Sequence, residues 1–581
     1  MNGKTIHPMK EQRGVVLVVA LLVLTVLSVL GLAFLTTART EDTIASNYRN
    51  HTAAFYAAEA GVESGVSTLK ATLAANPNTT DADLAKIVPA ALTDPSYTFS
   101  AFQVRRVRPT PYPTTIDSGP YAGLNALATA YEVTATVTGP RGSRARLTQR
   151  VNYVQVPLFQ FAIFNGRGVD LEITPSPAAK ITGRVHANSN LYLKEWTDLK
   201  FDGKMTSAGK ILRYTKPEGP GDRANDPKIK DALGVYQKLN FDHDSKVGFG
   251  GAWSEAEWAQ KALDIFGGTV KDSAHGVNEI LPPIPASFYD PKKPDVSSHQ
   301  LIERGVGGDT PELKDAKIYY DADIRIENGI VRDKDGKAIP MGKCDKNTIT
   351  TKTFYDPREQ KNVQVTEIDV GLMNACGVMP ANGILYAYNT STPAGIRLKN
   401  GSELPKTGLT VASENPIYIM GDYNTGGGDP KKKVPAAIMG DAVYILSNNW
   451  EKNNYDKKTK DDTDERPAAD TTVNAAVMLG PHAEAILNDD DSTNGYFENI
   501  FRFLEDWRQG APFPTSSTNF TYSGSIVSLW HSMQATAPFV QTPGYRTPPN
   551  RWWSYDTLFD TQLPPGTPMG IIYMRGQWSE G

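Results

Sequence analysis

The chain has 581 residues, more than one ordinary hydrophobic core holds, so we expect two or more domains. Its 60 basic and 64 acidic residues give a formal net charge of −4, which argues against a protein that binds nucleic acid over its whole surface. The chain has two cysteines, Cys344 and Cys376, which excludes a disulfide-dense small scaffold and a four-cysteine zinc site.

An uncharged apolar run from Val15 to Leu35 follows a basic leader, residues 1–14. A helix rises about 1.5 Å per residue, so this run makes a helix of about 30 Å, which matches a bilayer core. The run is longer than a typical secretory signal, and the TTARTEDT that follows is a poor cleavage site. Because the basic leader should stay in the cytoplasm, we expect a single span of the inner membrane with the bulk of the chain outside.

The helix is expected to continue well past the apolar run. No proline occurs from Thr36 to Leu73, and apolar residues recur at three-, four- and seven-residue steps. This spacing predicts an amphipathic stripe. We therefore predict one long helix over residues 15–76, which packs against copies of itself and against its own head. The stripe consists of Ile44, Tyr48, Phe55, Ala58, Val62, Val66 and Leu69.

The segments QRGVVLVVALLVLTVLSVLGLAFL and EDTIASNYRNHTAAFYAAEAGVESG resemble the N-terminus of PilX-type minor pilins of type IV pili. The resemblance implies that a prepilin peptidase cuts between Gly14 and Val15. It also implies that the chain then joins other pilins and minor pilins in an extracellular type IV pilus or a periplasmic pseudopilus. A K-type pseudopilin-like component of type II secretion and a plain membrane anchor stay open as alternatives.

The resemblance also gives Val19 a meaning. Most major pilins carry a glutamate at the fifth mature position, where it pairs with a neighbour's terminal amine, whereas this chain has Val19 there. A subunit with no neighbour above it has no amine to neutralise, and a buried unpaired carboxylate would be costly. The departure predicts a tip position, from which the subunit primes assembly and displays its head for adhesion.

Residues 77–157 are predicted to form a pilin-like antiparallel meander. YTFSAFQVRRV alternates polar and apolar residues, and TAYEVTATVTGPRGSRARLTQRVNYVQV reads as a hairpin that turns at Gly139–Gly142. The strands carry several arginines, for which we prefer a solvated strand face to a DNA-binding surface, so no specific nucleic acid is predicted. They are Arg105, Arg106, Arg108, Arg144, Arg146 and Arg150.

Residues 158–581 are predicted to form a large β-rich head with inserted loops. An Ile-Met-Gly-Asp motif at Ile419–Asp422 recurs 19 residues later at Ile438–Asp441, about one coil of a parallel β-solenoid. Within an overall α+β fold we therefore favour a β-solenoid or β-helix head and keep a β-sandwich as the alternative. YFENIFRFLEDWR is predicted to be an amphipathic helix, and the aromatic segment PGYRTPPNRWWSYDTLFDTQLPPGTP a strap across the solenoid.

Acidic residues gather on two short loops, DKDGK and NDDDSTNG, which makes calcium the candidate small ligand. Neither loop matches the full twelve-residue calcium loop, and β-turns explain both as well. No other cofactor is expected. The candidate calcium ligands are Asp333, Asp335, Asp489, Asp490 and Asp491.

The sequence contains no nucleophile elbow, zinc-protease motif or phosphate-binding loop, and its eight histidines are scattered. We therefore predict a structural protein and no enzyme, with a surface or glycan ligand for the head. The alternative is a membrane-stalked, polysaccharide-active β-helix enzyme, because paired carboxylates meet in space and not in sequence. Cys344 and Cys376 both follow the membrane helix, hence lie in an oxidising space, where they either form a disulfide or stay separate thiols.

Overall fold

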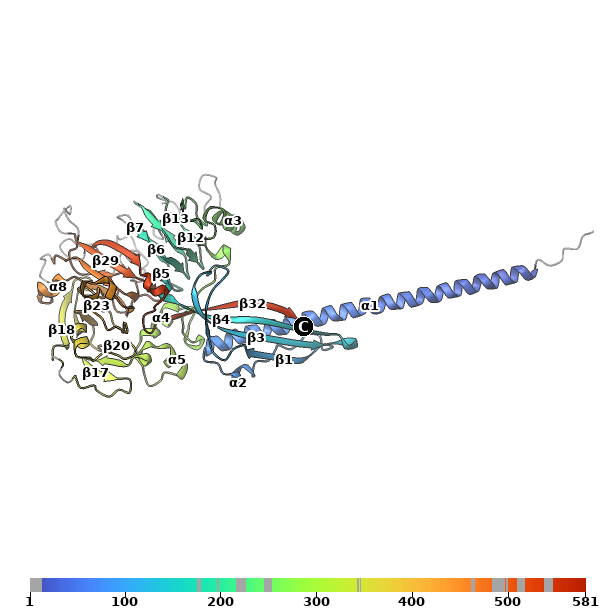
Figure 1. Cartoon of the computed structure of the whole chain (residues 1–581), viewed down its shortest axis with the longest axis horizontal. Helices are drawn as coiled ribbons and strands as arrows, with labels where there is room; N and C mark the ends of the chain where they lie inside the picture. Colours follow the sequence, from blue (N-terminus) through green and yellow to red (C-terminus); the bar gives the residue numbers. More distant parts are fainter. Residues whose placement is uncertain are drawn as a thin grey trace, which may run out of the picture.

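The computed structural model describes residues 13–174, 179–195, 198–215, 226–244, 253–341, 344, 346–460, 466–482, 497, 500–508, 518–537 and 547–581. A protruding helix, an antiparallel sheet packed along its second half, and a large β-rich head follow one another along the molecule (Figure 1). This arrangement confirms the predicted α+β fold class with its long N-terminal helix, meander and β-rich head.

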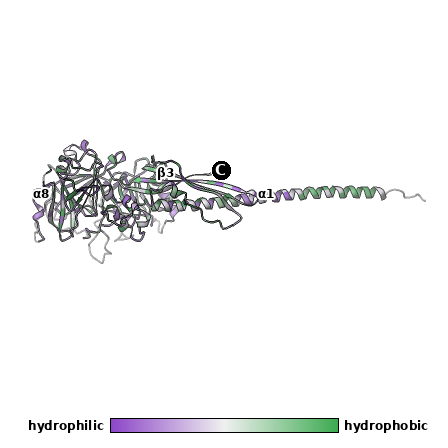
Figure 2. Ribbon diagram, turned by 90° about the horizontal axis from the view of Figure 1, so that it is seen from below, coloured by the Kyte–Doolittle hydropathy of each residue, from purple (hydrophilic) through white to green (hydrophobic). Residues whose placement is uncertain are grey.

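Helix α1 (Arg13–Ala75) is one unbroken helix of 63 residues. Its N-terminal part is long and apolar enough to cross a membrane, judged by length and composition, and forms the hydrophobic stretch in Figure 2. Glycine at positions 61 and 65 lets the sheet approach the helix closely. A Cβ atom at Gly61 would lie 2.3 Å from the ring of Phe99, and one at Gly65 would lie 2.6 Å from the ring of Phe102.

The sheet on α1 has the strand order β1-β3-β4-β32, and β2 pairs with β3. Its inner face and α1 share one core, in which Ala58, Val62 and Val66 are buried with Val133 and Leu147. The short helix α2 (Asp81–Leu84) precedes the sheet. The strands are β1 (Thr98–Arg106), β2 (Tyr112–Thr115), β3 (Asn125–Thr138), β4 (Arg144–Pro157) and β32 (Met569–Glu580).

Strand β32 corrects the prediction that all of residues 158–581 belong to the head. It pairs antiparallel with β4, from Met569 opposite Pro157 to Glu580 opposite Leu147. The chain therefore leaves the sheet for the head and returns to it at its C-terminus. The alternation within the last strand does not reveal which of several sheets it joins, because its partner lies hundreds of residues earlier.

The head is a solenoid of parallel sheets, as favoured over a sandwich. Its central sheet has eleven strands, and all neighbours pair in parallel except the terminal hairpin β16–β17. In spatial order these strands are β15 (Val270–Lys271), β11 (Met205–Ser207), β8 (Arg184–Ala187), β5 (Phe161–Asn165), β30 (Ile526–Ser528), β27 (Ala476–Met478), β24 (Ala436–Met439), β22 (Leu409–Ala412), β20 (Ile384–Tyr388), β16 (Ile324–Glu327) and β17 (Ile330–Asp333).

Smaller sheets form the other sides of the coils. Next to the first coils lie β6 (Leu171–Ile173), β9 (Leu191–Leu193) and β12 (Ile211–Leu212), and then β7 (Ala179–Ile181), β10 (Leu199–Phe201), β13 (Lys228–Lys230) and β14 (Tyr236–Lys238). A six-stranded sheet contains β18 (Ile349–Asp356), β19 (Lys361–Asp369), β21 (Ala394–Lys399), β23 (Ile417–Met420), β25 (Val443–Leu446) and β28 (Arg502–Phe503). The last sheet consists of β26 (Thr471–Asn474), β29 (Asn519–Gly524) and β31 (Asn550–Tyr555).

The first and last coils of the head meet in the middle of the solenoid. The chain builds outward from β5 to β15, crosses to the far end at β16, and then builds back until β30 pairs with β5. Ile163 lies opposite Ile526 in this pair, and the two stacks share one interior core. The entry and exit of the head are thus neighbours, which is why β4 and β32 can lie side by side.

Residues 272–323 make the crossing and cover the outer face of the central sheet. Ile280, Leu301 and Ile318 pack there against outward-facing residues such as Met439 and Val527. The helices near or within the crossing are α3 (Glu255–Phe266), α4 (Pro294–His299), α5 (Pro311–Ala316) and α6 (Ile318–Asp321), and α7 (Val370–Ala375) and α8 (Asn449–Lys452) lie further on. The central sheet is therefore buried on both faces, as parallel sheets usually are.

The predicted aromatic strap is wrong for Asn550–Tyr555, because these residues form a strand of a coil. Strand β31 pairs in parallel with β29, with Trp553 packed against the interior core and Trp552 exposed. Large aromatic residues in the sequence indicate burial. The composition is the same whether these residues fill the inside of a coil or cover its outer side, so the sequence does not distinguish the two. The end of the predicted strap does lie on the outside of the coils together with residues 272–323: Phe559 is buried in the cluster on the outer face, and the hydroxyl of Thr410 donates to the carbonyl of Pro565.

The repeated Ile-Met-Gly-Asp motif does not mark one coil. Ile419 lies on β23 and pairs with Leu398 and Ile445, whereas Ile438 lies on β24 of the central sheet and pairs with Val411 and Val477. The two copies thus occupy different sides of the solenoid, because strands on both sides end in a similar glycine turn. Successive coils here repeat after 26 residues, and the first coils of the head repeat after 20.

The helix predicted over YFENIFRFLEDWR is also wrong within the described residues. Arg502 and Phe503 form strand β28, which pairs in parallel with β25. Phe501 and Leu504 are buried, although not on a helix face. A strand buried on both faces shows apolar residues on consecutive positions, which a short sequence window does not distinguish from a helix.

Candidate functional site

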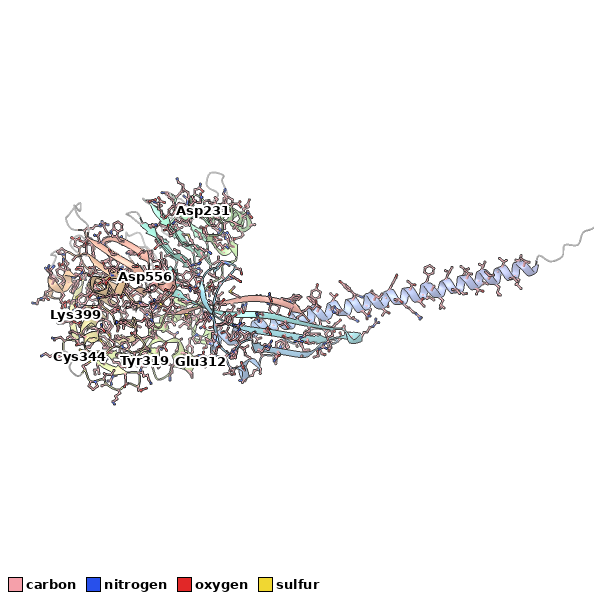
Figure 3. The ribbon with its side chains drawn as sticks, in the orientation of Figure 1. Asp231, Glu312, Tyr319, Cys344, Lys399 and Asp556 are labelled. Carbon is pink, nitrogen blue, oxygen red and sulfur yellow. A yellow bond between two sulfur atoms is a disulfide. The ribbon has the colours of Figure 1, made fainter. Side chains whose placement is uncertain are left out.

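The exposed part of α1 is one candidate functional surface. The predicted stripe divides into two parts: Ala58, Val62 and Val66 are buried against the sheet, whereas Ile44 and Tyr48 are 62% and 74% exposed. Figure 3 shows the side chains of this N-terminal part projecting from the helix without neighbours. An apolar surface of this length requires a lipid or protein environment.

The residues predicted to act in processing and assembly lie at the start of this surface. Gly14 and Val15 belong to the first turn of α1, and Val19, one turn later, is 54% exposed. Their roles in cleavage and in subunit contacts remain predictions.

The first predicted calcium loop is held together by its own hydrogen bonds. Oδ1 of Asp333 accepts the backbone N–H groups of Asp335 and Lys337 at 3.0 and 2.9 Å, and Asp335 pairs with Lys334. The second group, Asp489, Asp490 and Asp491, lies outside the described residues. Among the residues that the structure describes, no cluster of three or more histidine, cysteine or acidic side chains could hold a metal ion.

Cys344 and Cys376 are joined by a disulfide across a sequence separation of 32 residues. The bond links the segment before β18 to the end of α7, on the part of the head remote from the exposed helix (Figure 3). Its place suggests a staple for this segment and no catalytic role.

The arginines of the meander are partly neutralised. Arg105 and Arg150 both pair with Glu132, and Arg106 pairs with Asp81 at 3.6 Å. These contacts favour the solvated-face interpretation over an anion-binding surface.

A polar cavity of about 540 Å³ opens on the outer face of the six-stranded sheet. Its walls come from the loop after β20, the turn after β22 and residues 533–536, and the rings of Tyr418 and Tyr444 line it from the sheet. These two rings stack with centroids 4.3 Å apart. We call this space the amide cavity, because Asn389, Asn415 and Gln534 contribute to its lining.

The amides are positioned by the coil repeat. Asn389 and Asn415 follow paired strands of the central sheet, and the backbone N–H of Asn389 donates to Oδ1 of Asn415 at 2.8 Å. Nδ2 of Asn415 donates to Oε1 of Gln534 at 3.2 Å, and Nε2 of Gln534 donates to the carbonyl of Glu414 at 2.7 Å. One chain of amides therefore runs along the wall with its orientation fixed at both ends.

Asp441 holds the segment that carries Gln534. Its buried carboxylate accepts the hydroxyl of Ser532 and the backbone N–H groups of Met533 and Gln534, the latter two at 2.6 and 3.1 Å. Nε2 of His299 lies 3.2 Å from the same carboxylate. Burial alone would lower the pKa of His299, but its bonds to Asp441 and Glu303 outweigh burial and raise this pKa to about 9.

The carboxylates that line the amide cavity are each bound by an arginine. Glu359 accepts Nη1 of Arg502 at 2.9 Å and the backbone N–H of Ala537 at 3.1 Å. Glu414 pairs with Arg304 at 3.2 Å. Arg502 lies outside the lining and Lys361 belongs to it, so the charged lining residues are two acids and two bases.

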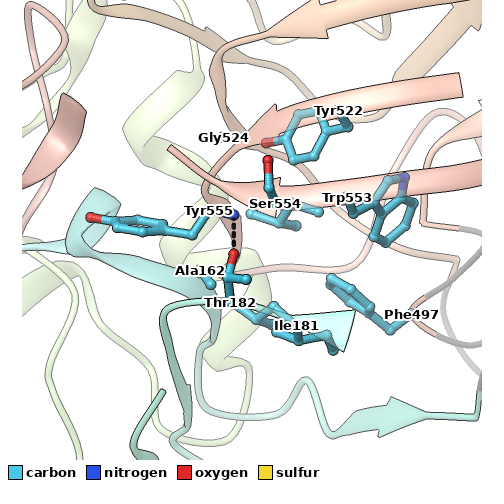
Figure 4. Close-up of a pocket in the computed structure, with 11 residues that line it drawn as sticks. Ala162, Ile181, Thr182, Phe497, Tyr522, Gly524, Trp553, Ser554 and Tyr555 are labelled. Atoms are coloured by element: carbon cyan, nitrogen blue, oxygen red, sulfur yellow. Dashed lines mark hydrogen bonds between the residues drawn. The ribbon is translucent and has the colours of Figure 1, made fainter. Parts of the chain in front are cut away.

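A second, apolar space lies inside the solenoid at the junction of its two stacks (Figure 4). Phe497, Tyr522 and Trp553 face Ile181 across it, and the backbone N–H of Tyr555 donates to Oγ1 of Thr182 at 2.8 Å. Its volume of about 20 Å³ has room for about one water molecule. It is a packing gap at the junction and not a ligand site.

Sequence reasoning did not find the amide cavity. Asp441 stands in the Ile-Met-Gly-Asp motif, which predicts a coil and not a cavity. Two asparagines 26 residues apart, each following an apolar strand, were the available signal. The contribution of residues 533–536 had no sequence signal, because Asp441 binds them from about ninety positions away.

Residues 13–63 match the family model described as PilX N-terminal. Among solved structures, the chain is similar to the competence-associated pilin ComZ from Thermus thermophilus, with 11% identity and a TM-score of 0.27 over 92% of this chain and 98% of that chain. At so low a TM-score the two folds are not equated. No curated protein matches the chain. Over its N-terminal helix the chain is similar to PilX-type pilins, which confirms the resemblance predicted from the sequence.

Proposed function

We propose that the chain is a pilin-like subunit of a type IV pilus or a related pseudopilus. The observation that carries this proposal is the division of α1 into an exposed apolar part and a part packed on the antiparallel sheet. The exposed part would lie in the inner membrane before assembly and among the helices of other pilins afterwards. The match of residues 13–63 to the PilX N-terminal model supports both roles.

We propose further that the subunit is cut by the prepilin peptidase between Gly14 and Val15 and sits at the filament tip, where it primes assembly and displays its head for adhesion. The head lies at the end of the molecule opposite the apolar part of α1 (Figure 1). Val19 supports the tip position, because it offers no carboxylate to a subunit above it.

The proposed work of the head is binding, not catalysis. Hydrolysis of a polysaccharide uses a pair of carboxyl groups, one of which must be protonated to act as the general acid, and a neighbouring arginine favours the ionised form. Glu359 and Glu414, the carboxylates that line the amide cavity, are held by Arg502 and Arg304. This pairing favours a display function over the polysaccharide-active alternative.

Immunogold labelling of sheared filaments tests the placement. We expect gold particles at filament ends for the wild-type chain, and none for a Gly14→Glu variant retained in the membrane. Labelling along the shaft would contradict the tip position, and labelling confined to the cell body would contradict the proposed pilin function.

A further inference from the structure

We propose that the amide cavity binds a neutral saccharide of one to a few sugar units. The inference deepens the adhesive role proposed above and rests on it, since it names the chemical class of ligand that the displayed head would take. It comes from the size, the lining and the rigidity of the cavity.

The size suits a small polar ligand. Small-molecule sites typically have volumes of about 300–1,000 Å³, and the amide cavity has about 540 Å³. The apolar gap inside the solenoid, at about 20 Å³, is far too small for any sugar. The cavity also opens on the outside of the head, where an extended glycan can enter with one end.

The lining matches hydroxyl groups. Asn389, Asn415 and Gln534 supply amide donors and acceptors, and Thr390 and Ser391 supply hydroxyls. A sugar ring presents the same mixture of donors and acceptors around its edge. The rings of Tyr418 and Tyr444 are buried beneath this polar lining and support it from the sheet.

The charges and the polarity exclude other ligand classes. The lining holds two bases, Arg304 and Lys361, and two acids, Glu359 and Glu414, and three of these four belong to ion pairs, so no cluster of like charges selects an anion or a cation. Lipids and amphipathic helices need a continuous apolar bed, and the amides and hydroxyls interrupt any such bed here. A neutral molecule rich in hydroxyl groups fits a lining that selects no charge and that offers many polar groups.

The cavity is rigid before any ligand arrives. The Asn415–Gln534 bond joins the coil turn to residues 533–536, and Asp441 fixes the same residues from beneath. Side chains held in this way lose little conformational entropy on binding, which favours affinity for a ligand that makes only hydrogen bonds. The fixed amides therefore have the properties of a binding site.

The test uses the full chain in detergent and a panel of neutral mono- to trisaccharides of hexoses and N-acetylhexosamines. Saturation-transfer NMR identifies the bound sugars, and calorimetry gives their affinity. Gln534→Ala removes an exposed amide, and Thr536→Trp places a large ring at the cavity wall. The matched controls are Gln562→Ala and Thr407→Trp, which change exposed residues that do not line the cavity.

We expect at least one saccharide to bind wild type and both controls, with binding weakened about tenfold or more in Gln534→Ala and Thr536→Trp, at unchanged melting temperature. No binding by wild type, or equal binding by all variants, overturns the proposal. Filament incorporation of the same variants is measured separately. If the chain is incorporated into filaments but binds no sugar, only the saccharide proposal is wrong. If it binds sugar but is not incorporated, only the proposed pilin function is wrong.

Discussion

The guanidinium of Arg575 forms a two-point ion pair with the carboxylate of Glu63 on α1, 512 residues earlier in the chain, at 2.5 and 2.6 Å. The hydroxyl of Tyr573 donates to the carbonyl of Lys70 at 3.3 Å, so the last strand is tied to the first helix at two places. Because β4 leads into the head and β32 leads out of it, the head is joined to the helix and its sheet by two neighbouring strands.

Removal of residues 569–581 should unfold the sheet on α1. Strand β32 covers β4 along ten paired positions from Met569 to Glu580, and its loss exposes part of the core that contains Tyr153. We expect limited proteolysis to cut residues 77–157 rapidly in the truncated chain. Glu63→Gln is the control: its ion pair is about half exposed, so we expect a loss below about 1 kcal/mol in the free energy of unfolding. Equal resistance of the truncated and full chains to protease would contradict this role of β32.

Gly203→Ala should destabilise the first coils of the head. A Cβ atom at Gly203 would lie 1.7 Å from the backbone oxygen of Gly183 on the preceding coil. Because this neighbour is backbone and not a flexible side chain, the clash can be relieved only if the two coils move apart. Overpacking of this kind costs about 1–3 kcal/mol. Thermal unfolding checks the prediction, with Gly307→Ala as control because a Cβ atom there meets nothing within 4 Å. Equal melting temperatures for the two variants would show that the coils can separate at this point.

The stability of the head should fall in alkaline solution through His299. Its pKa is about 9 in the folded chain and close to its ordinary value of 6.5 when unfolded. A raised pKa means that the folded state holds a proton that the unfolded state releases, so the stabilisation is complete below pH 6.5 and is lost as the pH rises through about 9. Chemical denaturation from pH 6 to 10 measures this loss. In His299→Gln, the loss between pH 6.5 and 9 should be reduced.

Glu505 provides an internal comparison for that experiment. Burial raises its pKa to about 8 against an ordinary value of 4.5, and Ser447 donates to it. The folded state again holds the extra proton, so stability should decline as the pH rises from 4.5 through about 8. The two ranges overlap between pH 6.5 and 8, so the two groups are distinguished outside this overlap. With the denaturation series extended down to about pH 4, Glu505→Gln should flatten the decline between pH 4.5 and 6.5 and leave the loss above pH 8 unchanged. If Glu505→Gln also alters the loss above pH 8, the assignment of that loss to His299 is wrong.

The sequence predicted the features that depend on local period and missed those that depend on distant pairing. The helical spacing from Ile44 to Leu69 predicted α1, because one helix face shows in one stretch of sequence. The partner of β32 and the meeting of β5 with β30 left no local trace. The amide cavity was missed for the same reason: Asp441 and Gln534 are neighbours only because the chain returns to the middle of the solenoid.

Gly14→Glu should block processing. The predicted peptidase cuts between Gly14 and Val15, and a charged side chain in place of the glycine's hydrogen should prevent that cleavage. We expect the variant to remain as the full-length precursor in the membrane fraction, and the wild-type chain in sheared filaments to begin at Val15. N-terminal mass analysis distinguishes the two forms. An intact Met1 on wild-type chains in filaments would contradict the cleavage site.

Val19→Glu should allow some incorporation along the filament shaft. A shaft subunit inserts below another subunit. The resemblance to pilins implies that the fifth mature residue of the lower subunit offers a carboxylate to the terminal amine of the subunit above it. In an apolar surrounding, opposite charges stabilise each other strongly and an unpaired charge is penalised by several kcal/mol. Val19 is exposed on a bare helix surface, so in this chain no intramolecular contact replaces the missing partner among the described residues. The wild-type chain should therefore occur at very low copy number that does not scale with filament length.

Quantitative mass spectrometry of purified filaments, sorted by length, measures this directly. We expect the ratio of wild-type chain to major pilin to fall as filaments lengthen, and the ratio for Val19→Glu to level off above it. Val19→Leu is the matched control, because it changes the side chain without adding a charge and should follow wild type. A wild-type ratio that stays constant with length would place the chain in the shaft. Subunit contacts elsewhere on the exposed face of α1, around Ile44 and Tyr48, would then have to compensate for the missing carboxylate.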